Sequence, residues 1–118
     1  MKIGIASHIV LDTIKSGGSA VDSLGGPACY CGITARRFGF DVELATKVGS
    51  DFPDGARNIL RDNNITLKDH SIASDPTTRF MLETDGESRR LMLQSKCSPI
   101  SEQDIAEMKV DCWIASPV

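Results

Sequence analysis

The sequence lacks long apolar runs and shows no excess of basic residues. No stretch approaches the roughly 18 apolar residues of a membrane-spanning helix. The first residues, MKIGIASHIVLD, lack the long apolar segment of a signal peptide. The chain carries 13 Lys and Arg against 16 Asp and Glu, which gives a net charge of −3. This balance gives no reason to expect a nucleic acid or an anionic membrane as the partner.

Paired metal ligands and a dinucleotide-binding motif are also missing. The four cysteines, Cys29, Cys31, Cys97 and Cys112, form no C-x-x-C pair, and the two histidines do not complete a zinc spacing. We therefore expect no metal site in this chain, and we expect buried free thiols in a reducing cytoplasm. The first strand, KIGIAS, would suit a dinucleotide-binding enzyme, but no G-x-G-x-x-G follows it, which disfavours that class.

The length of the sequence and the order of its predicted strands and helices are typical of one mixed α/β domain. Its 118 residues, 41% hydrophobic and 25% charged, are typical of a single globular domain. Apolar periodicity and turn residues predict strands at 2–7, 9–15, 20–24, 41–48, 71–73, 77–84, 89–94 and 112–115. Helices are predicted at 27–38, at 53–62 and after the N-cap residue Ser101. This order indicates an α/β core with β-hairpins set beside it.

The stretch from Gly25 to Gly55 is the most informative part of the chain. A glycine pair, Gly25-Gly26, precedes the helix that is predicted to begin at Pro27, and Gly39 is placed to end it. Two glycines at this position indicate a tight turn or a backbone that passes close to a ligand. Both interpretations remain open from the residues alone.

Asp12 is a polar interruption between apolar neighbours in the strand predicted at 9–15. The simplest interpretation is a solvated residue on an edge strand, because isolated carboxylates are mostly exposed. However, the hairpin that carries Asp12 leads directly into the glycine pair. Asp12, Gly25 and Gly26 can therefore face one pocket.

The last predicted strand, within Asp111–Val118, has the apolar character of an interior strand of a parallel sheet. Such a strand expects a crossover helix and a further strand beyond it. We therefore expect the sequence to be the front part of a longer protein.

Taken in order, these motifs resemble the N-terminal half of the ribokinase-like (PfkB) family of sugar and nucleoside kinases, over nearly the whole chain. The matching segments are Gly25-Gly26 followed by Pro-Ala, R-F-G at 37–39, V-G-S-D at 48–51, Gly55, D-N-N-I at 62–65, Thr77-Thr78, and the D-G turn at 85–86 followed by arginines. The resemblance implies a mostly parallel central sheet flanked by helices, with residues 1–118 forming the N-terminal part of one ribokinase-like domain. A small β lid, built from hairpins at about 9–24 and 77–95, would close over the substrate.

The resemblance further implies phosphorylation of a hydroxyl on a sugar, cyclitol or nucleoside, with ATP and Mg²⁺. Asp12 corresponds to the aspartate that holds the substrate hydroxyls, and Gly25 and Gly26 correspond to the backbone beside them. Tyr30 stands where relatives often have Asn, and we expect it to line the same pocket. The family's catalytic base lies in a G-A-G-D motif, which this sequence lacks together with the ATP-binding segment. We therefore expect this chain to supply the acceptor-binding half of a cytoplasmic kinase and to be inactive alone.

The alternative is a non-catalytic module that binds a small molecule or dimerises through the lid. Apolar residues alternate along the hairpin at 77–95, at Phe80, Leu82, Leu91 and Leu93. Such strands can pair with a second copy of the chain, so that a homodimer through the lid is expected.

Overall fold

The computed structural model describes all residues from 1 to 118. The strands are β1 (Lys2–Ala6), β2 (Val10–Ser16), β3 (Ser19–Gly25), β4 (Asp41–Ala45), β5 (Val48–Gly49), β6 (Ile72–Ala73), β7 (Arg79–Asp85), β8 (Ser88–Ser95) and β9 (Cys112–Ala115). The helices are α1 (Pro27–Arg37), α2 (Asp54–Asp62) and α3 (Glu102–Ala106), with a short 3-10 turn at Asp69–Ser71. None of the helices has the length and apolar character that a membrane crossing requires.

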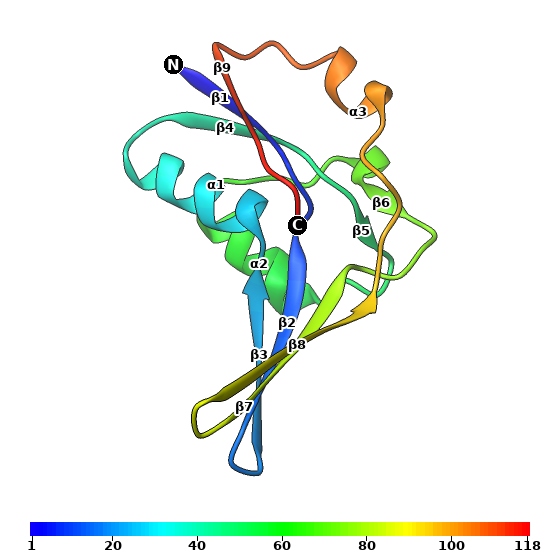
Figure 1. The fold of residues 1–118 in the computed structure, drawn as a ribbon. Helices are drawn as coiled ribbons and strands as arrows, with labels where there is room; N and C mark the ends of the chain where they lie inside the picture. Colours follow the sequence, from blue (N-terminus) through cyan, green and yellow to red (C-terminus); the bar gives the residue numbers. More distant parts are fainter.

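The body of the molecule is built on a parallel sheet in the order β4-β1-β9 (Figure 1). Ile5 of β1 pairs with Leu44 on one side and with Ile114 on the other. These three side chains therefore point to the same face of the sheet. Among the strands of residues 1–118, β9 lies at one edge of this sheet and exposes Cys112 and Trp113. Its prediction as an interior strand refers to a longer protein and stays a prediction.

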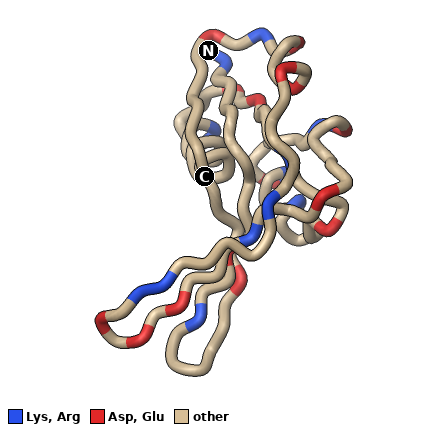
Figure 2. Tube along the Cα trace, turned by 45° about the vertical axis from the view of Figure 1, so that its right-hand side comes forward, with Lys and Arg blue, Asp and Glu red and all other residues tan.

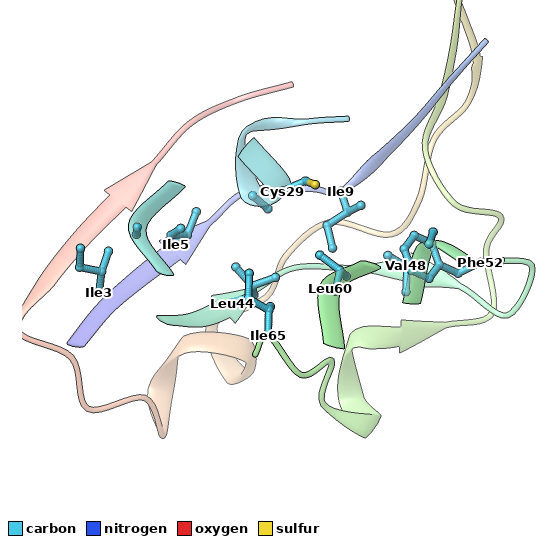
Figure 3. Close-up of a cluster of buried hydrophobic side chains, with 12 residues drawn as sticks. Ile3, Ile5, Ile9, Cys29, Leu44, Val48, Phe52, Leu60 and Ile65 are labelled. Carbon is cyan, nitrogen blue, oxygen red and sulfur yellow. The ribbon is translucent and has the colours of Figure 1, made fainter. Parts of the chain in front are cut away.

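The apolar core lies between this sheet and helices α1 and α2 (Figure 3). Its twelve buried members are Ile3, Ile5, Ile9, Ala28, Cys29, Ala35, Leu44, Val48, Phe52, Ala56, Leu60 and Ile65. Gly32 allows α1 to lie close to the sheet and to Ile65, because a Cβ at this position would be 3.6 Å from Cδ2 of Leu44 in β4 and 3.2 Å from Cδ1 of Ile65. The same cluster reaches Ile9, the residue that precedes β2. The core therefore fixes the point at which β2 leaves the body.

Local signals place the ends of the helices well. Pro27 is the first residue of α1, and Gly39 follows the helix with a φ of 89°, a conformation that suits glycine. The predicted cap of α3 is confirmed. The backbone N–H and the hydroxyl of Ser101 donate to Oδ2 of Asp104 at 2.6 and 3.0 Å. Lys47 contacts Oδ1 of Asp104 at 3.0 Å, which attaches α3 to the body.

Two expectations about local structure are wrong. The strand predicted at 41–48 is two strands, because the chain turns at Thr46 and Lys47, and β5 then pairs with β6 instead of β1. Oγ1 of Thr46 holds this link by accepting the N–H of Ile9 at 3.1 Å. All four cysteines are free, as expected, but only Cys29 and Cys97 are buried. Cys112 is exposed because it lies on the edge strand β9.

Two hairpins project from the body as one four-stranded sheet, in the order β3-β2-β7-β8, which we call the projecting sheet (Figure 1). Within it, β2 pairs with β3 in antiparallel and with β7 in parallel orientation. Figure 2 shows acidic and basic residues together on this sheet, so it has no charge of a single sign. Segments far apart in the sequence thus share one sheet.

One face of the projecting sheet is apolar and open. The register aligns Asp12 with Phe80, and Phe80 with Leu93, so these side chains lie on the same face. Val21 and Leu91 extend this face toward the tips of the hairpins and are 61% and 64% exposed. Asp12 is therefore the carboxylate of a largely apolar surface.

Candidate functional site

Asp12, Gly25 and Tyr30 come together where the projecting sheet joins the body. Asp12 lies on β2, Gly25 ends the neighbouring strand β3, and Tyr30 is near the start of α1. A Cβ built on Gly25 would overlap Oδ2 of Asp12 and would lie 3.6 Å from the Tyr30 hydroxyl. The Asp12 carboxylate thus occupies the space left by the missing side chain of Gly25. The structure brings together three of the four residues that the sequence singled out.

Gly26 faces in a different direction and has a clear role in the fold. Its φ is 91° and its ψ is 153°, a combination almost restricted to glycine. A Cβ built on it would lie 2.6 Å from the carbonyl oxygen of His8 and 3.1 Å from the backbone nitrogen of Val10. Gly26 therefore lets α1 start against the link between β1 and β2. A substrate contact by Gly26 stays a prediction.

The Asp12 carboxylate is half-buried and has no partner within the chain. Burial raises the pKa of Asp12 above its ordinary value, and no hydrogen bond or neighbouring cation offsets this effect. A partly desolvated carboxylate without a partner is suited to accept hydrogen bonds from a ligand. The Tyr30 side chain is 58% exposed, so that its hydroxyl is also open to a ligand.

Asp51 has a role that the sequence did not predict. Its Oδ1 accepts the hydroxyl and the backbone N–H of Thr77 at 2.7 and 2.9 Å, and its Oδ2 contacts Nη2 of Arg79 at 3.1 Å. Burial acts to raise the pKa of Asp51, but the hydrogen bonds from Thr77 and Arg79 outweigh it and lower that pKa. Asp51 therefore connects the turn before α2 to Thr77 and to Arg79, the first residue of β7, at the base of the projecting sheet. The V-G-S-D segment was the only signal for Asp51 in the sequence. The partners of Asp51, Thr77 and Arg79, lie 26 and 28 residues further along the chain.

The chain offers no ligand set for Mg²⁺ or another metal ion. No group of three or more His, Cys, Asp or Glu side chains is arranged to hold one. The Asp12 carboxylate stands alone, whereas Mg²⁺ in kinases is held by carboxylates together with substrate phosphates. The residues of this chain therefore do not form a site for Mg²⁺.

The fold is that of the ribokinase-like kinases. A pyrophosphate-dependent kinase in the ribokinase family, complexed with a pyrophosphate analog and myo-inositol, matches with a TM-score of 0.78 and 21% identity, over 98% of this chain and 39% of that chain. A nucleoside kinase from Methanocaldococcus jannaschii matches with a TM-score of 0.66 and 22% identity, over 79% of this chain and 36% of that chain. An uncharacterized sugar kinase from Pyrococcus horikoshii, in complex with ATP, matches with a TM-score of 0.69 and 19% identity, over 89% of this chain and 40% of that chain.

These matches confirm the predicted fold class, a mixed α/β architecture with parallel strands, flanking helices and a small separate sheet. The chain spans about two fifths of the length of these kinases. No family model matches the sequence, and no protein of curated function matches it. At the identities found, the likeness establishes the fold.

Proposed function

We propose that this chain is the acceptor-binding half of a kinase that phosphorylates a hydroxyl of a sugar, cyclitol or nucleoside. The observation that carries this proposal is the unpaired Asp12 carboxylate beside Gly25 and Tyr30, within a ribokinase-like fold. Structural neighbours include a kinase complexed with myo-inositol and a nucleoside kinase, which supports an acceptor with several hydroxyl groups.

In this proposal Asp12 positions the acceptor. Its two oxygens accept hydrogen bonds from acceptor hydroxyls, and Gly25 leaves the space in which the carboxylate lies. The Tyr30 hydroxyl supplies a further polar contact, and Gly26 supplies backbone at the edge of the site. The projecting sheet acts as the lid that shields the acceptor from water. Holding the acceptor in one orientation is itself a large part of catalysis.

ATP with Mg²⁺ is the donor that we propose, with its binding residues and the catalytic base outside residues 1–118. Support for ATP comes from the neighbour that is complexed with it. Another neighbour uses pyrophosphate, so both donors belong in the assay. The 118-residue chain alone is expected to transfer no phosphate. Its four free cysteines suit the cytoplasm, where we place the protein.

Phosphorylation of a polyhydroxyl acceptor by the full-length protein tests this function. We expect ADP formation from ATP to depend on one member of a panel of sugars, inositols and nucleosides, with the rate without acceptor as the baseline. A parallel series replaces ATP by pyrophosphate and measures phosphate release. If no acceptor raises the rate above the baseline with either donor, the kinase proposal fails.

Dimerisation through the projecting sheet is a second role, which the open apolar face favours. Val21 and Leu91 are 61% and 64% exposed on this face, although both are large apolar residues. We expect the mass in solution to rise toward that of a dimer with concentration, and Val21→Glu with Leu91→Glu to keep the protein monomeric. Ile59→Glu changes an apolar residue on α2 that is 47% exposed and serves as the control. A wild-type protein that stays monomeric at all concentrations contradicts this role.

A further inference from the structure

The projecting sheet is attached to the body at its base, and Thr77 is the centre of this attachment. Thr77 is fully buried and lies two residues before the start of β7. Its hydroxyl donates to Oδ1 of Asp51 at 2.7 Å and accepts the N–H of Gly49 at 2.9 Å. Its carbonyl oxygen accepts the hydroxyl of Ser95, the last residue of β8, at 2.6 Å. The chain that enters the second hairpin and the chain that leaves it are thus both tied to Thr77, and Thr77 is tied to the body.

Arg79 makes a second and weaker link close to this point. Its Nη2 lies 3.1 Å from Oδ2 of Asp51, and the two side chains are 37% and 38% exposed. This is the only ion pair that joins the projecting sheet to the body, since the other five lie within the body. A half-exposed ion pair shifts an equilibrium by only about 2- to 5-fold. The pair can therefore break and form again while the buried bonds of Thr77 stay intact.

The Arg79 side chain leaves the sheet on the face opposite to Asp12. Leu11 is the register partner of Arg79 in β7 and of Leu24 in β3, whereas Asp12 is the partner of Phe80. Successive residues of a strand point to opposite faces of a sheet. Arg79, Leu11 and Leu24 therefore share one face, and Asp12 and Phe80 lie on the other.

The face that carries Arg79 is turned toward α2 but is not packed tightly against it. A cavity of about 190 Å³ lies between them, and its walls include Leu11, Leu24 and Arg79 of the sheet and Pro53, Ala56 and Ile59 of the body. This volume would hold several water molecules. Asp51 lies three residues before the start of α2, so its ion pair with Arg79 connects the two walls of the cavity.

We propose that the Arg79–Asp51 ion pair holds the projecting sheet in an open orientation and breaks when the sheet closes over the acceptor. The inference rests on the proposed function, in which the face with Asp12 covers the acceptor. Closure tilts the sheet toward that face and moves Arg79 away from Asp51, because their pair lies on the opposite face. The bonds of Thr77 form the pivot of this tilt. Asp51 thus has two roles, since its Oδ1 belongs to the pivot and its Oδ2 to the ion pair.

Steady-state kinetics of the full-length protein test whether the ion pair opposes closure. We expect Arg79→Met to lower the KM of the acceptor by about 2- to 5-fold, because the closed state becomes more populated, and to leave kcat unchanged or lower. Asp51→Asn should have the same effect, since the amide oxygen still accepts the bonds from Thr77 while the charge is lost. Arg79→Lys should restore the wild-type KM. Arg90→Met removes an exposed arginine of β8 that belongs to no ion pair and is the matched control.

Ionic strength separates the loss of an ion pair from a general loosening of the fold. In 1 M NaCl the Debye length is about 3 Å, so that exposed charges are largely screened. With a neutral acceptor and saturating donor, the KM values of the wild-type protein and of Arg79→Met should then converge. An acceptor KM that stays unchanged or rises in Arg79→Met, or an equal fall in Arg90→Met, overturns the inference while the kinase function stands.

Distances between spin labels measure the tilt without catalysis. Labels carried by non-natural amino acids replace Glu87, at the tip of the β7–β8 hairpin, and Arg61, near the end of α2, which are both exposed. Dilution with unlabelled protein removes distances between subunits. We expect Arg79→Met to shift the distribution toward longer distances and Arg90→Met to match the wild-type protein. If no acceptor is phosphorylated, the proposed function fails, and these distances decide on the ion pair by themselves. An unchanged distribution in Arg79→Met overturns the inference.

Discussion

Replacing Asp12 by Ala is expected to lower kcat/KM of the full-length protein in the proposed kinase reaction by about 100-fold without weakening the fold. Two hydrogen bonds from acceptor hydroxyls to the carboxylate, each worth about 1.5 kcal/mol, give about 3 kcal/mol, and each 1.4 kcal/mol is tenfold in rate. The fold does not depend on Asp12, because its carboxylate has no partner within the chain and burial disfavours its charged form. Removal of the carboxylate should therefore leave the melting temperature unchanged or raise it.

Gly25→Ala should also lower kcat/KM, because it displaces the Asp12 carboxylate instead of removing it. The added methyl group would overlap Oδ2 of Asp12, which is the movable end of a side chain, so the carboxylate is displaced while the backbone stays. Thr13→Ala is the control, since Thr13 lies on the same strand but bonds to Asp22 on the opposite face. If kcat/KM is unchanged in Asp12→Ala, Asp12 does not belong to the acceptor site.

The same carboxylate sets a pH dependence. In the proposed function the acceptor binds to ionised Asp12, and burial raises the pKa of this carboxyl group. Activity is therefore lost as the pH falls through this raised pKa, at a higher pH than an ordinary aspartate would give. In Asp12→Ala this acid limb of the kcat/KM profile should disappear.

Gly26→Ala is expected to lower the free energy of unfolding by roughly 2–6 kcal/mol. The backbone at Gly26 has a φ of 91° and a ψ of 153°, which costs any other residue about 1–3 kcal/mol. In addition, the new Cβ would lie 2.6 Å from the carbonyl oxygen of His8, a backbone atom that cannot move alone, and overpacking of this kind costs about 1–3 kcal/mol. Urea unfolding followed by circular dichroism measures the loss.

Gly39→Ala separates the two contributions. Gly39 has nearly the same φ, 89°, but a Cβ there would meet no atom within 4 Å. Gly39→Ala should therefore lower the free energy of unfolding only by the conformational cost, about 1–2 kcal/mol. Equal losses in the two variants would show that the close approach of Gly26 to His8 contributes nothing to stability.

The parts of the fold that the sequence predicts well are those whose causes are local. Pro27 and Gly39 bound α1, Ser101 caps α3, and the Asp85-Gly86 step forms the turn between β7 and β8. The division of residues 41–48 into two strands could not be derived in this way. It depends on which strands pair across the chain, and periodicity carries no information on that pairing.

The same distinction between local and long-range causes applies to the candidate site. Asp12 and Gly25 lie on one hairpin, so their proximity follows from antiparallel pairing once the turn at Gly17-Gly18 is recognised. The connection of Asp51 to Thr77 and Arg79 has no such signal. Arg79 begins β7, which pairs in parallel with β2, a contact between segments more than 60 residues apart in the sequence.

The parallel pairing of β2 with β7 has a consequence for any motion of the projecting sheet. Backbone hydrogen bonds join the two hairpins into one sheet, so a tilt against the body would carry both hairpins together. Asp12 on β2 and Phe80 on β7 would then keep their spacing while their distance from the body changes.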